Sequence, residues 1–280
     1  MLGAIIGDIV GSRYEFNPTN DYNFEMFADG SNFTDDTVCT IAVADALLRG
    51  RDYGGSIHEW CRKYPNPKGG YGGRFRQWVM SDNPHPYCSF GNGSAMRVSP
   101  IGWWYDDPRD LTEQATKSAE CSHNHEYGIG GAVAVVSAIA DCRRMRREKD
   151  VSQLTPNEIL EEGLSHATLQ YVKCIDQFRV DLDANRNKFD ETCQDTVPVA
   201  LWIVMHSTGF EDAIRRAVSL GADADTLGAI VGSIAEAIWG IPEWMKKKAM
   251  SYLPKEMQSV VKEFHRRLNV RSHIDFLPKI

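Results

Sequence analysis

Apolar residues recur along much of the chain at helical spacing. Between Val38 and Leu48 they fall at i, i+3 and i+4 intervals, and Gly50 follows, where helices commonly stop. The stretch from Gly128 to Arg147 begins among small and β-branched residues and ends in arginines, which suit a helix C-terminus. The alternation of apolar and polar positions that marks a strand is scarce. The pattern therefore predicts an all-α chain.

Four further helices are predicted in the second half of the chain. Val197–Met205 is apolar almost all round, as an interior helix is, whereas Glu211–Leu220 and Glu256–Leu268 are amphipathic. Asp225–Trp239 is rich in glycine and alanine, which lets neighbouring helices approach closely. A capping box at Thr155–Glu158, with proline at the first helical position, opens one more helix.

The irregular parts of the chain are predicted at 16–33, 63–100 and 179–195. Loops this long inside a compact domain are uncommon and are often functional. The sequence shows neither an internal repeat nor a Pro/Ser-rich linker. We therefore expect a single domain over residues 1–280, a compact, orthogonal all-α helical bundle with long active-site loops.

The overall charge disfavours nucleic acid as a partner. The formal net charge is −7, and the dense basic runs, Arg143–Arg147 and Lys246–Lys248, fall where helices are expected to end. Hydrophobic residues make up 42% and charged residues 25% of the chain, which is ordinary for a folded protein and argues against disorder.

Location is predicted from the cysteines and from the absence of targeting signals. The chain has seven cysteines, an odd number, and no CxxC pair. The first residues lack a basic region and a cleavage signal, and no apolar run reaches the ~20 residues of a membrane span. We expect a cytoplasmic protein with reduced thiols and no membrane association.

Two clusters of oxygen ligands precede predicted helices. Thr34, Asp35 and Asp36 form the first cluster, and Asp223, Asp225 and Thr226 form the second, each at a helix start. Helix capping explains one acceptor at such a position, but it does not explain paired carboxylates, which repel one another unless a cation is present. If the two clusters converge, these oxygen ligands favour Mg²⁺, Mn²⁺ or Ca²⁺ over Zn²⁺.

Three other motifs carry weaker signals. Glycines 3, 7 and 11 share one helical face, and Glu15 follows either as a group facing a cleft or as a solvated loop residue. The loop Gly91–Ser94 is either a diphosphate-binding loop or a simple turn. His123 is interpreted as a capping or phosphate-contacting residue, because its surroundings match no closed zinc site.

In this order, the motifs resemble those of the ADP-ribosylglycohydrolase family, which includes bacterial dinitrogenase-reductase-activating glycohydrolases and eukaryotic ADP-ribosylhydrolases. Each motif is weak alone, whereas the ordered set is specific and covers nearly the whole chain. The matching segments are GAIIGDIVGSRYE, FTDDT, GNGSAMRVSPIG, SHNHEYGIGGA and GADADTLGAIVGSIAEAIWG.

The resemblance implies a site with two divalent cations, Mg²⁺ or Mn²⁺, in an all-α bundle. It implies contacts with ADP-ribose by the loop residues and His123, and a glutamate, Glu15, beside the metals. The residues that match the family's metal-binding motifs are Thr34, Asp35, Asp36, Asp223, Asp225 and Thr226, and those that match its ADP-ribose contacts are Gly91, Asn92, Gly93, Ser94 and His123.

The activity implied is hydrolysis of the bond between ADP-ribose and a modified acceptor, a protein side chain or a small adduct. Glu15, Asp36 and Asp225 are the candidate catalytic residues, with Glu15 either an acid/base or a gate of the metal site. Two alternatives stay open: another two-metal hydrolase, such as a nucleotide phosphoesterase, and a non-catalytic ADP-ribose-binding protein. The acceptor is undecided, although Glu15 slightly favours an O-glycoside over an arginine N-glycoside.

Overall fold

The helices account for most of the fold. The computed structural model describes residues 1–148 and 180–274 of the chain, and in these ranges the extended pairings are isolated β-bridges, Thr34 with Lys68 and Gly91 with Thr192. The prediction of an all-α fold is confirmed. The capping box predicted at Thr155–Glu158 and the first residue of the loop predicted at 179–195 lie outside the described residues.

The first half of the chain forms eight helices within the described residues 1–148. They are α1 (Leu2–Gly11), α2 (Asp35–Arg49), α3 (Tyr53–Lys63), α4 (Gly73–Met80), α5 (Gly93–Met96), α6 (Ser99–Trp104), α7 (Pro108–Glu120) and α8 (Glu126–Glu148). Those of the second half are α11 (Leu182–Asn185), α12 (Cys193–Met205), α13 (Phe210–Ser219), α14 (Ala224–Trp239), α15 (Glu243–Tyr252) and α16 (Lys255–Ile274).

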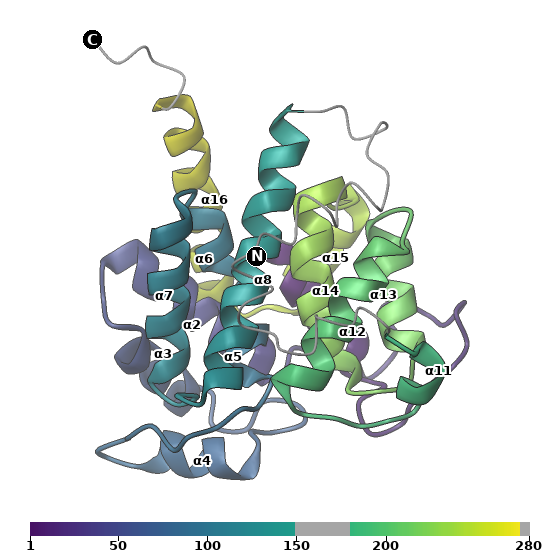
Figure 1. The fold of residues 1–280 in the computed structure, drawn as a ribbon, viewed down its shortest axis with the longest axis horizontal. Helices are drawn as coiled ribbons and strands as arrows, with labels where there is room; N and C mark the ends of the chain where they lie inside the picture. The colour runs from purple at the N-terminus through teal and green to yellow at the C-terminus, as the bar shows by residue number, and fades with distance from the viewer. Residues whose placement is uncertain (149–179, 275–280) are drawn as a thin grey trace.

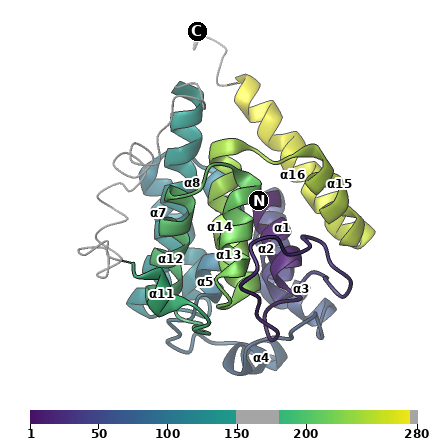
Figure 2. The same ribbon diagram turned by 90° about the vertical axis from the view of Figure 1, so that its right-hand side faces the viewer.

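The centre of the bundle is α14. Every residue from Ala224 to Ile238 is buried, and the helix contacts α1, α8, α12 and α13 (Figure 1). All ten residues of α1 are buried as well, although this helix comes from the opposite end of the sequence. Figure 2 shows α13 and α14 in the middle of the molecule, with α1 and α2 beside them.

The predicted glycine face of α1 packs directly on α14. A Cβ atom on Gly7 would overlap the carbonyl group of Gly228, and Cβ atoms on Gly3 and Gly11 would also meet the α14 backbone. Because these positions carry only hydrogen, the two backbones lie in contact. The glycine- and alanine-rich sequence of α14 therefore has the packing role that its composition predicted.

The start and end of α2 are both determined by local sequence. Thr34 caps its N-terminus, with the side-chain oxygen accepting from the N–H of Asp36, and Gly50 ends it in the left-handed conformation at φ 63°. The same logic places α3 behind Asp52, whose carboxylate accepts from the N–H of Gly55. The first turn of α2 is thus held in a defined orientation.

Two predicted irregular stretches are partly wrong. The described part of 179–195 contains α11 and the first residues of α12. Residues 63–100 contain α4, α5 and the start of α6, whose short lengths hide the helical period. The apolar side of α4, formed by Phe75, Trp78 and Val79, is buried. Residues 16–33 are irregular, as predicted. In both ribbon views α4 and its flanking loops lie at the lower end of the molecule, opposite the projecting end of α16 (Figures 1 and 2).

Candidate active site

A buried aspartate on α1, Asp8, anchors the first turn of α2. One oxygen, Oδ2, accepts from the backbone N–H groups of Thr34 at 3.0 Å and Thr37 at 3.1 Å, and from the Thr37 hydroxyl. The other oxygen, Oδ1, is buried and has no hydrogen-bond partner. Asp8 therefore fixes α2 against α1 and still presents a free acceptor.

At the start of α2, Thr34 caps the helix, and the neighbouring Asp35 and Asp36 carry the acids. Thr34 is fully buried and caps the helix, while Oδ2 of Asp36 accepts from the hydroxyls of Thr34 at 3.2 Å and Thr226 at 3.3 Å. Oδ1 of Asp36 has no partner. Asp35 is half-buried and lines a cavity. The capping interpretation is therefore correct for Thr34, but it leaves the two acids unexplained.

At the head of α14, both acids are buried. Asp223 occupies the N-cap position without a capping hydrogen bond, and its Oδ2 accepts from the side-chain amide of Asn92 at 2.8 Å. Asp225 accepts from the N–H of Thr226 at 3.0 Å. Helix capping therefore does not explain why two acids stand here.

The acids of α1, α2 and α14 meet in space. One carboxylate oxygen from each of Asp8, Asp36 and Asp225 lies within 4.8 Å of the others, and all three residues are buried. Buried like charges at this range are costly unless they bind protons or a cation. The partnerless oxygens of Asp8 and Asp36 are the kind of ligand that Mg²⁺ and Mn²⁺ prefer.

The pKa values of these acids reflect that cost. Burial and the charge of Asp225 raise the pKa of Asp8 to about 7. Burial is also the main cause of the raised pKa of Asp36, Asp223 and Asp225. Without a cation the cluster is therefore partly protonated near neutral pH, and a bound cation would favour its ionised form.

Glu15 lies beside this cluster. Its pKa is raised to about 8 by burial, by the charge of Asp225 and by a hydrogen bond with the Asp225 side chain, while Lys68 opposes the shift. The carboxylate lies so close to Gly69, at φ 77°, that a Cβ there would be 2.5 Å from Oε2. Glu15 is therefore not the solvated loop residue of the simpler interpretation.

A cavity of about 440 Å³ opens onto the cluster. Four acidic residues that line it, Glu15, Asp35, Asp223 and Asp225, belong to the cluster just described or its edge. The loop at Gly91–Gly93 connects them to a second group of lining residues: the Asn92 side chain binds Asp223, and Gly93 faces His123.

The second group of lining residues is basic and aromatic. It includes Arg97, whose side chain is fully buried and whose Nη2 donates to the Ser118 carbonyl at 2.7 Å, while Nε and Nη1 have no partner. Arg74 lies over the Tyr87 ring, 4.8 Å from its centroid. A buried guanidinium with two unpaired nitrogens favours an anion in the adjacent cavity.

His123 contributes a neutral ring to the same wall. Burial, and secondarily the charges of Arg97 and Arg74, lower its pKa well below the usual value. Its Nδ1 is 2.7 Å from the Ser122 hydroxyl, and a Cβ on Gly93 would be 3.1 Å from its Nε2. The ring can therefore hydrogen-bond a ligand without adding charge.

Comparison with known proteins identifies the family of this chain. The family described as ADP-ribosylglycohydrolase matches residues 1–273. The chain belongs to the ADP-ribosylglycohydrolase family. The resemblance predicted from the ordered motifs is thereby confirmed, and with it the assignment of the chain as an ADP-ribosyl hydrolase.

The chain is similar to several relatives over nearly its whole length. It is 25% identical to the ADP-ribosylarginine hydrolase Tri1 of Pseudomonas putida, covering 99% of this chain and 80% of that one. It is 24% identical to human ADP-ribosylhydrolase ARH3, covering 95% and 92%, and 26% identical to an uncharacterised protein of Archaeoglobus fulgidus, covering 96% of each.

A solved structure supports the same fold. The chain superposes on an ADP-ribosylglycohydrolase-related protein complex with a TM-score of 0.67 and 22% identity, covering 95% of both chains. None of the helices within residues 1–148 and 180–274 is long and apolar enough to cross a membrane.

The ADP-ribosylglycohydrolase structure brings most of the predicted site residues to one cavity. Those that line it are Glu15, Asp35, Gly91, Asn92, Gly93, His123, Asp223, Asp225 and Thr226. Thr34 and Asp36 lie just behind this wall. Ser94 does not line the cavity: it is fully buried, and its hydroxyl donates to the Gly128 carbonyl at 2.7 Å.

Sequence reasoning missed two prominent residues. Asp8 was hidden within an apolar helix, yet a lone acid between Ile6 and Ile9 is itself a signal of a buried functional carboxylate. Arg97 lies within the segment GNGSAMRVSPIG, and its complete burial is visible only in the fold.

Proposed function

We propose that the protein hydrolyses the glycosidic bond between ADP-ribose and a modified acceptor, with two divalent cations, Mg²⁺ or Mn²⁺, held by the acidic cluster. The observation that carries this proposal is the meeting of three buried carboxylates, from Asp8, Asp36 and Asp225, at the end of a cavity whose other wall contains Arg74 and Arg97. An acidic site joined to an anion site suits a ribose next to a diphosphate.

The donor set suits hard divalent cations, and their number, two, is part of the proposal. The cluster offers oxygen ligands only, and the partnerless oxygens of Asp8 and Asp36 remain available. Asp35, Asp36, Asp223, Asp225 and Thr226 would hold the cations, with Asp8 as an additional ligand or as the group that orients α2. When bound, the cations would supply a water of lowered pKa and would polarise the ribose hydroxyls.

The remaining residues would bind and orient the substrate. The backbone N–H group of Gly93, together with Arg74 and Arg97, would hold the diphosphate. This remote binding would fix the reacting ribose against the acids, since binding energy away from the reacting bond contributes to its orientation. Asn92 keeps Asp223 in place by its hydrogen bond.

Two residues are placed to handle protons. Glu15 shares a hydrogen bond with Asp225 and carries a raised pKa, so it can hold a proton near neutral pH. In the proposed reaction water attacks the anomeric carbon as the bond to the acceptor breaks, passing through an oxocarbenium-like transition state. Asp225 would orient the water, and Glu15 would give its proton to the departing acceptor and regain one from the attacking water.

The proposal is tested with defined substrates. Peptides ADP-ribosylated on arginine or on serine, poly(ADP-ribose), O-acetyl-ADP-ribose and simple nucleotide phosphate esters are assayed with Mg²⁺, with Mn²⁺ and with excess EDTA. Release of ADP-ribose that needs the cation supports the proposal. Cleavage of the phosphate esters alone would indicate a phosphoesterase, whereas binding of ADP-ribose without turnover of any substrate would indicate a non-catalytic binding protein.

Thermal stability should depend on pH in opposite ways without and with a bound cation. Raised carboxyl pKa values mean that the folded protein binds protons more tightly than the unfolded chain, so the stability of the metal-free protein should fall as pH rises from about 5 to about 8. Cations need the ionised acids, so their stabilising effect should grow over the same window.

The measurement is the melting temperature at about pH 5.5 and about pH 8.5, in EDTA and in Mn²⁺. We expect Mn²⁺ to raise the melting temperature more at the higher pH. In free energy of unfolding, the extra stabilisation should be on the order of a few kcal/mol. A difference independent of pH would contradict the cation site.

A further inference from the structure

Two exposed phenylalanines form an aromatic pair at the mouth of the cavity. The rings of Phe16 and Phe189 are stacked, with centroids 6.1 Å apart and planes 30° apart, and both residues line the cavity. Their side chains are among the most exposed large apolar groups of the described residues, at 71% for Phe16 and 47% for Phe189. Neither the packing of the core nor the proposed site accounts for them.

The pair lies on the side of the cavity next to the acids. Phe16 directly follows Glu15 in the chain. Phe189 is two residues before Glu191, whose carbonyl accepts from the Asn92 N–H at 2.7 Å, and Asn92 in turn holds Asp223. Both phenylalanines are therefore tied to residues around the proposed cation site, whereas Arg74 and His123 line the other part of the cavity.

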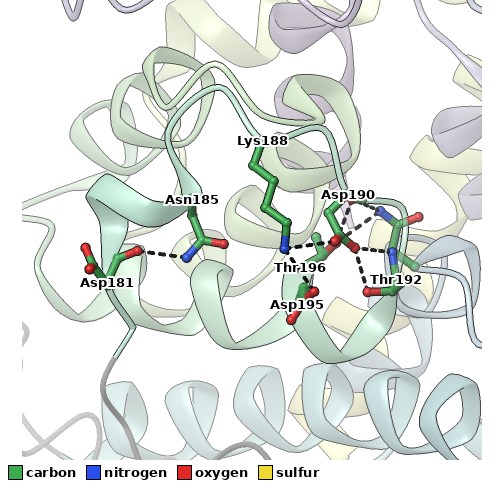
Figure 3. A network of polar contacts seen from close by, with 8 residues as sticks. Asp181, Asn185, Lys188, Asp190, Thr192, Asp195 and Thr196 are labelled. Atoms are coloured by element: carbon green, nitrogen blue, oxygen red, sulfur yellow. Dashed lines mark hydrogen bonds and ion pairs between the residues drawn. The ribbon is translucent and has the colours of Figure 1, made fainter.

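The loop that carries Phe189 is anchored by its own polar network. Figure 3 shows Lys188 bridging Asp190 and Asp195, with Oδ1 of Asp190 accepting from the backbone N–H and the hydroxyl of Thr192. The N–H of Asn187 donates to the Leu220 carbonyl at 3.0 Å. An aromatic ring that is exposed on a loop held this firmly is available to a ligand without an ordering cost.

The acceptor of an ADP-ribosyl substrate must pass this pair. A protein side chain carrying ADP-ribose enters the 440 Å³ cavity with its nucleotide, while the protein to which it belongs stays outside. The bond to be cleaved lies at the acids, so the acceptor group itself lies between the acids and the mouth. Phe16 and Phe189 line the cavity and are exposed, as residues in that position would be.

The charges around the pair select the kind of acceptor. Glu15 and Glu191 line the cavity beside the phenylalanines, and Lys68 is the cation that acts on Glu15. With Glu15 protonated, two bound divalent cations would still not fully neutralise the five nearby carboxylates of Asp8, Asp35, Asp36, Asp223 and Asp225. Phenyl faces in an acidic setting suit a planar cation, and guanidinium groups stack on aromatic faces.

We propose that Phe16 and Phe189 form an acceptor subsite that holds the guanidinium group of an ADP-ribosylated arginine. This inference rests on the proposed function. The ring separation is short of the roughly 7 Å that a sandwiched planar group needs at contact distance, so Phe16, the more exposed ring, moves to admit it. In the reaction, water adds to the anomeric carbon, the carbon–nitrogen bond breaks, and the departing guanidine takes a proton derived from that water.

The test compares two substrates on the wild-type protein and two double variants. A peptide ADP-ribosylated on arginine and the same peptide ADP-ribosylated on serine are assayed with wild-type protein, with the double variant Phe16→Ala/Phe189→Ala and with Phe16→Leu/Phe189→Leu. The affinity for free ADP-ribose is measured by calorimetry for each protein, and melting temperatures confirm folding. Trp244→Ala removes an aromatic ring of similar exposure from α15, away from the cavity, and serves as the matched control.

We expect kcat/KM for the arginine substrate to fall about 10- to 100-fold in both double variants, because leucine offers no π face. We expect less than about a threefold change for the serine substrate, for ADP-ribose affinity and for the control. Equal losses on both substrates, no loss, retained activity in the leucine variant, or weaker ADP-ribose binding would each overturn the subsite.

The wild-type results separate this inference from the proposed function. Hydrolysis of the serine substrate alone would overturn the arginine subsite and leave the proposed function standing. If no ADP-ribosyl substrate is hydrolysed with either cation, the proposed function fails, and the acceptor subsite fails with it.

Discussion

Asp225→Asn is expected to lower turnover of an ADP-ribosylated substrate by on the order of 10³-fold while making the metal-free protein more stable. The activity falls because the substitution removes a carboxylate that shares a 4.8 Å cluster with Asp8 and Asp36. The stability rises because an amide of the same shape removes one of several buried like charges, whose repulsion raises the pKa of Asp8 and Glu15.

Two measurements check this prediction together. Melting in EDTA should give a higher temperature for the variant than for the wild type, and the stabilisation by Mn²⁺ should be largely lost. Asp82→Asn is the matched control, because the Asp82 side chain is 96% exposed and changes charge without touching the site. Full turnover by the Asp225 variant, or a metal-free protein that is less stable than wild type, would refute the role given to the cluster.

Gly7→Ala is expected to destabilise the protein by about 3 kcal/mol or more, although it adds only one methyl group. A Cβ on Gly7 would overlap the backbone of Gly228, and backbone atoms of two buried helices cannot move aside as a flexible side chain can. The helices α1 and α14 would have to separate, and both would lose contacts along their length.

Urea unfolding provides the measurement for this second prediction. Gly209→Ala is the control, since a Cβ there would meet nothing within 4 Å and the residue has extended backbone geometry at φ 175°. The control should stay within about 0.5 kcal/mol of wild type. A Gly7 variant as stable as the control would mean that the two helices are not in backbone contact.

Much of the fold was predictable because its signals are local. The helical period, the Gly50 stop and the glycine face of α1 were each readable from a few neighbouring residues, and all are present in the structure. The helices α4 and α5 were not predicted, since they are short and lie among glycines and prolines that suggest irregular structure.

The candidate site was predictable to the extent that its acids stand at helix starts. Asp36 and Asp225 were recognisable because capping does not need paired acids, and the fold brings them together. For Asp8 the sequence signals only a buried acid in an apolar helix, and its meeting with Asp36 and Asp225 depends on the fold. The pairing of Phe16 with Phe189 depends on two loops that are distant in sequence, so only the three-dimensional structure could reveal it.

The burial of α1 has a consequence for how the chain folds as it is made. Apart from Asp8 this helix is apolar and it is buried on all sides, and its main neighbour, α14, begins more than two hundred residues later. During synthesis α1 leaves the ribosome long before α14 exists, so it must remain without its partner until most of the chain has been translated. Contacts this distant in sequence slow folding and expose apolar surface, which makes the unfinished chain a candidate client of chaperones.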